Sequence, residues 1–272
     1  MSKINLGIIG LGQMGSAIAG GLASSGLKNE FQIFGSTRGT DSAKEAAKDL
    51  GIRCGTDNSD VVKSADIIIL AIKPHQVEKT LKSVASQLKP NQLLISICAS
   101  ITTEQLDEWS DHKPSIIRAM PNTPCLIRNG MTAICEGPRS KKQDIDIATK
   151  IFSSLGKVAV IEESLFDGVT GLSACGPAYI YLILESFSEA GVKIGISRET
   201  SILLAAQTMM GAAQMVLQGN KHPASLKDEV TTPAGCTIDG LMALEEGKLR
   251  VTLIKGVLAA TRRSKALRLA KQ

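Results

Sequence analysis

The chain has 272 residues with 31 Lys and Arg against 26 Asp and Glu, which gives a formal net charge of +5. Aromatic residues are only 3% of the chain, too few for a typical nucleic-acid surface. The six cysteines form no CxxC pair and the three histidines lie far apart, so we expect no metal site. No stretch resembles a signal peptide or a membrane span. We therefore expect a cytoplasmic protein with neither a nucleic acid nor a membrane as partner.

The N-terminal stretch combines an apolar run with a glycine-rich turn. Residues 4–9 are typical of a strand buried on both faces, and helical spacing of apolar residues begins at residue 14. Between them, Gly10 allows a tight turn, Gly12 lets a pyrophosphate approach the backbone, and Gly15 lets the helix pack on the strand. The pattern predicts a dinucleotide-binding turn whose intervening residues also contact the cofactor, namely Leu11, Gln13 and Met14. An ordinary strand-to-helix turn is the alternative reading.

The second expected strand, residues 31–35, ends in a sequence that concerns the choice of cofactor. An NAD-binding protein often has Asp or Glu near this point, where its carboxylate holds the ribose 2′-hydroxyl. This chain has Ser36, Thr37 and Arg38 instead, two hydroxyls and a cation that suit a 2′-phosphate. The alternative is a polar turn without a ligand. We expect NADP(H) as the cofactor, with NAD(H) used at lower preference.

Further strand ends extend the candidate cofactor site. Ligands of open α/β sheets collect beyond the carboxyl ends of the strands. The buried run at residues 66–72 is the clearest strand, and the runs at 93–97 and 115–119 follow it. After the second of these comes a segment of small residues, and after the third an irregular loop with two prolines. The residues expected at the cofactor are Ala71, Ile72, Lys73, Pro74, Met120, Pro121 and Asn122.

The pattern of elements changes near residue 165. Before it, strands alternate with helices, including a helix at 58–63 with Asn58 as its N-cap, as in a doubly wound sheet. After it, apolar periodicity predicts long helices at 179–191, at 197–219 and from 250 to the end. The middle helix is apolar on more than one face, which favours burial against a second subunit. We expect a Rossmann-type domain at 1–163 and an all-helical dimerisation and substrate domain at 164–272. The basic end, residues 262–271, is expected to be a solvated helix.

Two segments could bind a substrate. The loop at 230–240 contains small residues, and Thr237 opens a helix whose N-terminal amides would stabilise a carboxylate. A simple cap by Thr237 explains the same pattern equally well. Glu162 and Glu163 follow the last strand, either as a solvated pair or with one carboxylate facing a cationic substrate nitrogen.

With these motifs in place, the chain resembles the pyrroline-5-carboxylate reductase family from end to end. The loop ending in Thr237 is the most diagnostic match, whereas the glycine turn is shared with many dehydrogenases. The matching segments are residues 10–14, 71–74, 118–124, 176–179 and 222–238.

The resemblance implies reduction of 1-pyrroline-5-carboxylate to L-proline with NADPH. It also implies a Rossmann domain followed by helices that interlock between subunits, in a homodimer or a decamer. By motif match, Ser36, Asn58, Lys73 and Ala99 would contact the cofactor. Thr237 would be the catalytic residue beside the imine nitrogen, and the substrate would further contact Glu163, Thr232, Gly235 and Cys236.

The chain departs from the family pattern at a few positions. The family commonly has glycine where this chain has Ala234, and Ala234 would shift the loop if the backbone there needs a positive φ. Small residues replace small residues throughout, so the pocket volume is roughly kept. The alternatives are another imine or β-hydroxyacid reductase and a non-catalytic NADP-binding regulator.

Overall fold

The computed structural model describes residues 3–269, which form two compact units. Residues 3–175 and 260–269 make up the first unit, and residues 176–259 make up the second. The expected domain boundary after residue 163 remains a prediction. Residues 1–2 and 270–272, the outer ends of the two expected domains and of the basic segment, lie outside the described residues.

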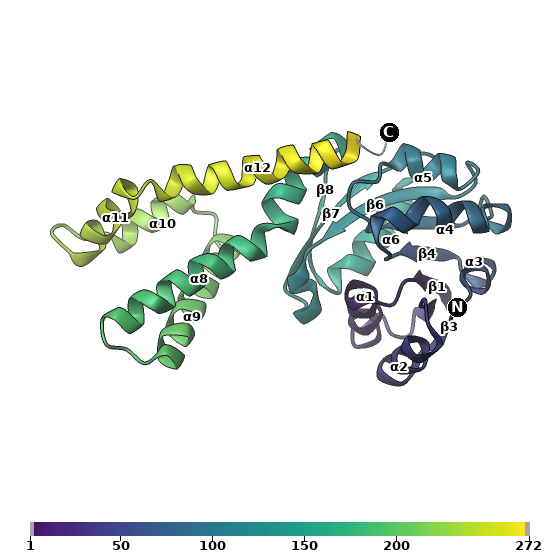
Figure 1. Ribbon diagram of the computed structural model, residues 1–272, viewed down its shortest axis with the longest axis horizontal. Coiled ribbons are helices and arrows are strands. Elements are labelled where there is room, and N and C mark those ends of the chain that lie inside the picture. The colour runs from purple at the N-terminus through teal and green to yellow at the C-terminus, as the bar shows by residue number, and fades with distance from the viewer. Residues whose placement is uncertain (1–2, 270–272) are drawn as a thin grey trace. The chain divides into compact units, whose positions relative to one another are not determined.

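The first unit is built on one eight-stranded sheet with the order β3-β2-β1-β4-β5-β6-β7-β8 (Figure 1). The strands are β1 Ile4–Ile9, β2 Phe31–Ser36, β3 Arg53–Gly55, β4 Ile67–Leu70, β5 Leu93–Ser96, β6 Ser115–Pro121, β7 Gly130–Glu136 and β8 Gly156–Val160. All neighbours are parallel except β6 and β7, which are antiparallel. Strand order reverses beside β1, which pairs with both β2 and β4. That reversal creates the crevice in which ligands of such sheets bind.

Helices cover both faces of this sheet, as the Rossmann-type prediction requires. Side chains of α1, α2 and α6 join one core, and those of α3, α4 and α5 join the other. The helices of this unit are α1 Gln13–Ala23, α2 Thr40–Leu50, α3 Asn58–Ser64, α4 Val77–Val84, α5 Thr103–Trp109, α6 Lys142–Ser153 and α7 Phe166–Val169. Short turns of helix lie between them at Pro74–Gln76, Ala85–Gln87, Thr123–Ile127 and Glu163–Leu165, with a π-helical turn at Thr170–Ala174.

Helix α3 begins differently from the prediction. Its N-cap is Asp57, whose carboxylate accepts a hydrogen bond from the amide of Ser59. Asn58 is the first helical residue, and its side-chain carbonyl accepts a hydrogen bond from Ser36 instead. Asp and Asn are equally good N-caps, so local preference could not decide between two adjacent residues.

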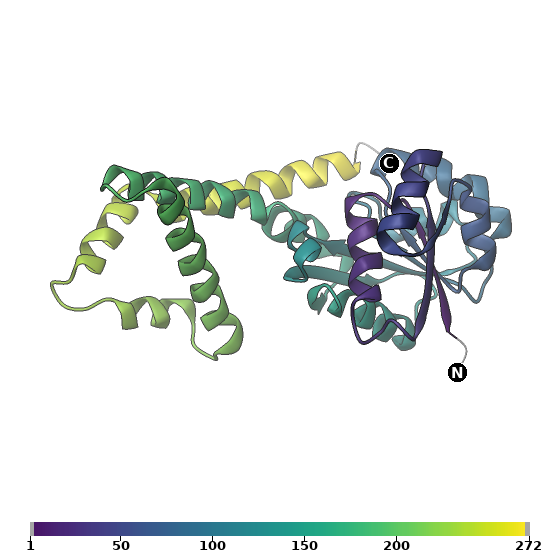
Figure 2. The same ribbon diagram turned by 90° about the horizontal axis from the view of Figure 1, so that it is seen from below.

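The second unit contains only helices (Figure 2), and α8 contacts α9 in it. Its helices are α8 Gly176–Lys193, α9 Arg198–Gln218, α10 Pro223–Val230 and α11 Cys236–Glu246, with the first part of α12 Leu249–Leu269. Large apolar side chains on these helices remain exposed in the single chain. Leu203 is 66% exposed and Leu217 is 68% exposed, for example.

Helix α9 corrects one expectation from the sequence. By length and composition this helix is apolar enough to cross a membrane. Only 11% of its most apolar 18-residue segment is buried within the chain. The expectation that no stretch meets this criterion was therefore wrong. Length and composition do not distinguish a membrane span from a helix that a second subunit buries.

The C-terminal part of α12 is a largely exposed helix, as expected for the basic end, but two of its side chains attach it to the rest of the first unit. The carboxylate of Asp167 accepts hydrogen bonds from Ser264 Oγ at 2.7 Å and from Arg268 Nε at 3.1 Å. Asp167 and Ser264 are both buried. Because Asp167 lies about a hundred residues earlier in the chain, this ion pair leaves no local signal in the sequence.

Candidate functional site

A cleft lies at the carboxyl ends of the central strands, where the strand order reverses. Two adjoining cavities of about 480 and about 1030 Å³ share Gly10, Thr37, Arg38, Ile72 and Gln76 in their walls. The cleft brings together most of the residues predicted to bind the cofactor, namely Gly10, Leu11, Gly12, Gln13, Met14, Ser36, Thr37, Arg38, Asn58, Ala71, Ile72, Lys73, Pro74, Ala99 and Pro121. None of the residues that line either cavity is acidic, so the cleft suits an anion.

The glycine turn has the geometry that a pyrophosphate requires. Gly10 has a φ of 99°, and a Cβ atom built there would lie 2.7 Å from the carbonyl oxygen of Ala71. Both the backbone angle and the close approach therefore require glycine at residue 10. Around Gly12, by contrast, a Cβ atom would meet nothing within 4 Å. The protein's own packing does not need glycine there, but a phosphate against the first turn of α1 would.

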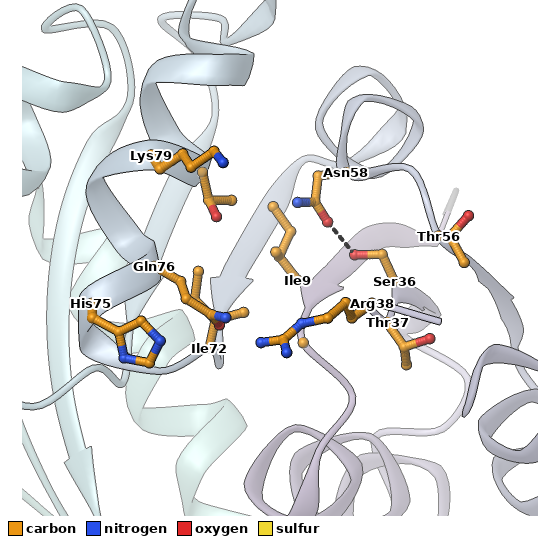
Figure 3. Close-up of a pocket in the computed structure, with 12 residues that line it drawn as sticks. Ile9, Ser36, Thr37, Arg38, Thr56, Asn58, Ile72, His75, Gln76 and Lys79 are labelled. Carbon is orange, nitrogen blue, oxygen red and sulfur yellow. Dashed lines mark hydrogen bonds between the residues drawn. The ribbon is translucent and has the colours of Figure 1, made fainter. Parts of the chain in front are cut away.

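The smaller cavity adjoins the end of β2 (Figure 3). Ser36 Oγ donates a hydrogen bond to Asn58 Oδ1 at 2.7 Å, which turns the amide group of Asn58 toward the cavity. Thr37 Oγ1 donates to the carbonyl of Gly39 at 3.0 Å. Both hydroxyl protons are thus engaged within the protein. Arg38, the Asn58 amide and the Thr56 hydroxyl are groups on this side that can donate to a phosphate.

The opposite wall of the smaller cavity comes from the segment after β4 and includes His75, Gln76 and Lys79. Figure 3 shows the Lys79 ammonium extending toward the opening that Asn58 faces from the other side. Sequence reasoning missed Lys79, although it lies one turn beyond a strand end already assigned to the cofactor. The cavity therefore presents cations from two elements, the β2 end and α4.

Two predicted cofactor contacts do not line the cleft. Met120 is 5% exposed and packs in a small core with Cys135 and Phe166. Asn122 accepts a hydrogen bond from the amide of Met131 and donates one to the carbonyl of Ser173. The geometry assigns both residues to the structure around the cleft, and their contact with the cofactor remains a prediction.

In the second unit, the loop before α11 is a tight turn. The amide of Gly235 donates to the carbonyl of Thr232 at 3.1 Å, and Ala234 has a φ of 55°. The positive φ that the sequence raised as a question for Ala234 is therefore present. The N-cap of α11 is Gly235, without a side-chain hydrogen bond, and Thr237 is the second helical residue. Thr237 is thus not the cap of this helix, and its half-buried hydroxyl has no partner among residues 3–269.

Known proteins match this chain over nearly its full length. Residues 163–267 match the family model described as pyrroline-5-carboxylate reductase dimerisation, and residues 5–100 match the model described as NADP oxidoreductase, coenzyme F420-dependent. A pyrroline-5-carboxylate reductase of Arabidopsis thaliana is 38% identical over 97% of this chain and 96% of its own length. The chain belongs to the pyrroline-5-carboxylate reductase family.

Solved structures of other pyrroline-5-carboxylate reductases agree with this assignment. One from Coxiella burnetii has a TM-score of 0.92 and 33% identity, covering 98% of this chain and 99% of that one. A pyrroline carboxylate reductase from Plasmodium falciparum, solved with NADP bound, has a TM-score of 0.86 and 35% identity over 98% of this chain and 99% of that one. These matches confirm the predicted fold class, a Rossmann-type sheet followed by helices.

Within this reductase, Glu163 occupies a position that the sequence did not anticipate. Its Oε1 accepts hydrogen bonds from the Thr103 amide at 2.8 Å and from Arg118 Nη1 at 2.9 Å. Its Oε2 accepts one from Thr103 Oγ1 at 2.6 Å. Both carboxylate oxygens are therefore engaged inside the first unit. Among the described residues, no group of three or more His, Cys, Asp or Glu is arranged to hold a metal ion.

Proposed function

We propose that this chain reduces 1-pyrroline-5-carboxylate to L-proline with NADPH. The observation that carries the proposal is the match over nearly the full length, which includes both the cofactor unit and the helical unit. The proposed substrate is inferred from the relatives, which are pyrroline-5-carboxylate reductases. The cleft independently suits the cofactor, because it combines a glycine turn, a helix N-terminus and several cations without an acidic residue.

The cofactor would lie along the cleft, with each part held by a different element. The first turn of α1, after Gly12, would hold the pyrophosphate on its amide groups. Arg38 and Lys79 would hold the 2′-phosphate, which gives the proposed preference for NADPH over NADH. Ala71–Pro74 and Ala99 would form the wall on which the remainder rests. When bound, the reduced nicotinamide supplies a hydride to C5 of the cyclic imine.

The loop before α11 would hold the substrate. The N-terminal amides of this helix, at Cys236 and Thr237, would stabilise the substrate carboxylate. Thr237 would be the catalytic residue, with its hydroxyl hydrogen-bonded to the ring nitrogen. This role is supported by the motif match and by the hydroxyl having no other partner in the described part of the chain. Thr232 and Gly235 shape the turn that presents these groups.

The reaction can be tested by the loss of NADPH absorbance with 1-pyrroline-5-carboxylate and by detection of proline. The parallel reactions use pyrroline-2-carboxylate with NADPH and a small β-hydroxyacid with NADP. We expect the first imine to react fastest, because the relatives that match this chain over nearly its full length are pyrroline-5-carboxylate reductases. Faster turnover of either competitor would assign the chain to another reductase activity. Tight NADPH binding without turnover of any of them would indicate a regulator.

We also propose that two copies of the chain associate through the second unit. The match to a dimerisation model at residues 163–267 supports this, and so do the exposed apolar side chains of α9. Light scattering at micromolar concentration should report a dimer or a decamer. A stable, active monomer of 28.7 kDa would contradict the proposal. Cytoplasmic location and the lack of nucleic-acid and membrane partners stay predictions from composition.

A further inference from the structure

The side chain of Arg118 is an unusual feature of the first unit, because it is a cation in the core. Arg118 lies on β6 and is 2% exposed. Its guanidinium lies over the ring of Phe166, with 4.5 Å from its central carbon to the ring centroid. Its Nε atom is buried without a hydrogen-bond partner. A buried charge of this kind needs a counter-ion, and the described residues provide it in Glu163.

Glu163 connects this buried cation to the start of α5. Its side chain is 29% exposed, and it accepts from both the backbone amide and the hydroxyl of Thr103. Thr103 is the first residue of α5, directly after the N-cap Thr102. Glu163 therefore joins the turn that follows β8 to the middle of β6 and to the start of α5.

The loop between β5 and α5 is part of the cofactor cleft. It contains Cys98 and Ala99, which line the larger cavity, and Ser100 with a φ of 61°. Ala99 also packs against the small core that contains Phe166. Two contacts thus support this short loop. Glu163 holds the start of α5 at one end of the loop, and Phe166, whose ring lies against Arg118, packs in the core that Ala99 contacts.

We propose that Glu163 is a positioning residue, which fixes the β5–α5 loop and with it the Ala99 wall of the cofactor cleft. The inference rests on the proposed cofactor site, and it replaces a direct contact between Glu163 and the substrate. The carboxylate acts through its bonds to Thr103 and Arg118. Loss of these bonds frees the loop, so cofactor binding weakens while the substrate loop before α11 is unchanged.

Two substitutions separate the positioning role from a contact with the substrate. Glu163→Gln keeps the shape and one acceptor oxygen, removes the charge, and replaces the other oxygen with an NH2 group that can donate to the Thr103 hydroxyl. We expect it to bind NADPH nearly as well as the parent chain and to keep the KM for the imine, although its melting temperature falls because Arg118 loses its counter-ion. Glu163→Ala removes the bonds as well. We expect its dissociation constant for NADPH to rise roughly fivefold or more, with kcat recovering at saturating NADPH.

The matched control is Glu162→Ala, one residue earlier, because Glu162 is exposed and its carboxylate accepts only from Ser164 in the described residues. It should bind NADPH as the parent does. Thr103→Val removes one donor without removing a charge, and a smaller weakening of NADPH binding is expected from it. This variant keeps the test available if Glu163→Ala does not fold.

The measurement is a fluorescence titration with NADPH, followed by the KM for the imine at saturating NADPH. A raised KM for the imine in Glu163→Gln, with unchanged NADPH binding, would indicate that Glu163 contacts the substrate and would overturn the inference. Unchanged NADPH binding in both Glu163→Ala and Thr103→Val would also overturn it. If the parent chain itself binds no NADPH, the proposed function fails instead, so the two failures are distinguishable.

Discussion

Replacing Arg38 with Met tests the proposed choice of cofactor. Met keeps an apolar stem of similar length but removes the guanidinium that faces the smaller cavity. A hydrogen bond to a charged group contributes about 1.5–3 kcal/mol. Arg38 is exposed, so solvent screening places its contribution at the lower end, about 1.5 kcal/mol. The dissociation constant for NADPH should therefore rise roughly tenfold.

NADH provides the internal comparison, because it carries a hydroxyl where NADPH carries the 2′-phosphate. We expect the dissociation constant for NADH to stay nearly unchanged in Arg38→Met. Both constants can be measured by fluorescence titration at low and at high salt. Added salt should weaken NADPH binding more in the parent than in the variant, because the variant has lost one of the screened charges.

Arg53→Met is the matched control for this substitution. Arg53 is also exposed, but it lies over the ring of Phe34, with 4.9 Å from its central carbon to the ring centroid, and outside both cavities of the cleft. Its replacement should leave both cofactors unaffected. Equal losses of NADPH and NADH binding in Arg38→Met, or a comparable loss in Arg53→Met, would refute the role of Arg38 at the 2′-phosphate.

Three further predictions concern the substrate loop and the core. Thr237→Ala should lower kcat/KM by about 1–3 kcal/mol, roughly tenfold or more, whereas Thr237→Ser should retain most activity, as steady-state kinetics can show. Ala234→Gly should raise the free energy of unfolding by about 0.5 kcal/mol, because glycine accepts the positive φ; Ala47→Gly, within α2, should instead lower it by about 1 kcal/mol in the same urea titration. Burial raises the pKa of the Cys135 thiol from 9.0 to about 12, so the unfolded chain loses this proton first as the pH rises. Stability should accordingly fall by about 1.4 kcal/mol between pH 8 and pH 10, and Cys135→Ala should lack this part of the slope.

The parts of the site that could be predicted from the sequence are those that depend only on residues close together in the chain. The strand at residues 4–9, the glycine spacing after it and the cation at Arg38 all lie on short contiguous segments. Each follows from backbone geometry or charge within a few residues, and the cleft brings them together. Even here the detail differed, because Ser36 positions Asn58 with its hydroxyl rather than offering that proton to a ligand.

The parts that could not be predicted depend on contacts between distant segments. Lys79 belongs to the cleft only because α4 lies across the smaller cavity from the end of β2, which the neighbours of Lys79 in the sequence do not reveal. The departure at Ala234 is of a different kind, since the sequence raised the question of its φ and only the backbone could answer it.

The segment after β8 illustrates why acidic residues near a predicted site are difficult to interpret. Glu163 and Asp167 each pair with an arginine, Arg118 and Arg268, from distant parts of the chain. A carboxylate beside a substrate loop and a carboxylate beneath a helix look identical in sequence. The buried Arg118 shows which of the two Glu163 is, because a cation that is 2% exposed needs an anion within the fold as its partner. An acidic residue that follows a strand should therefore be assigned to a ligand only after the buried cations of the same unit have been given their partners.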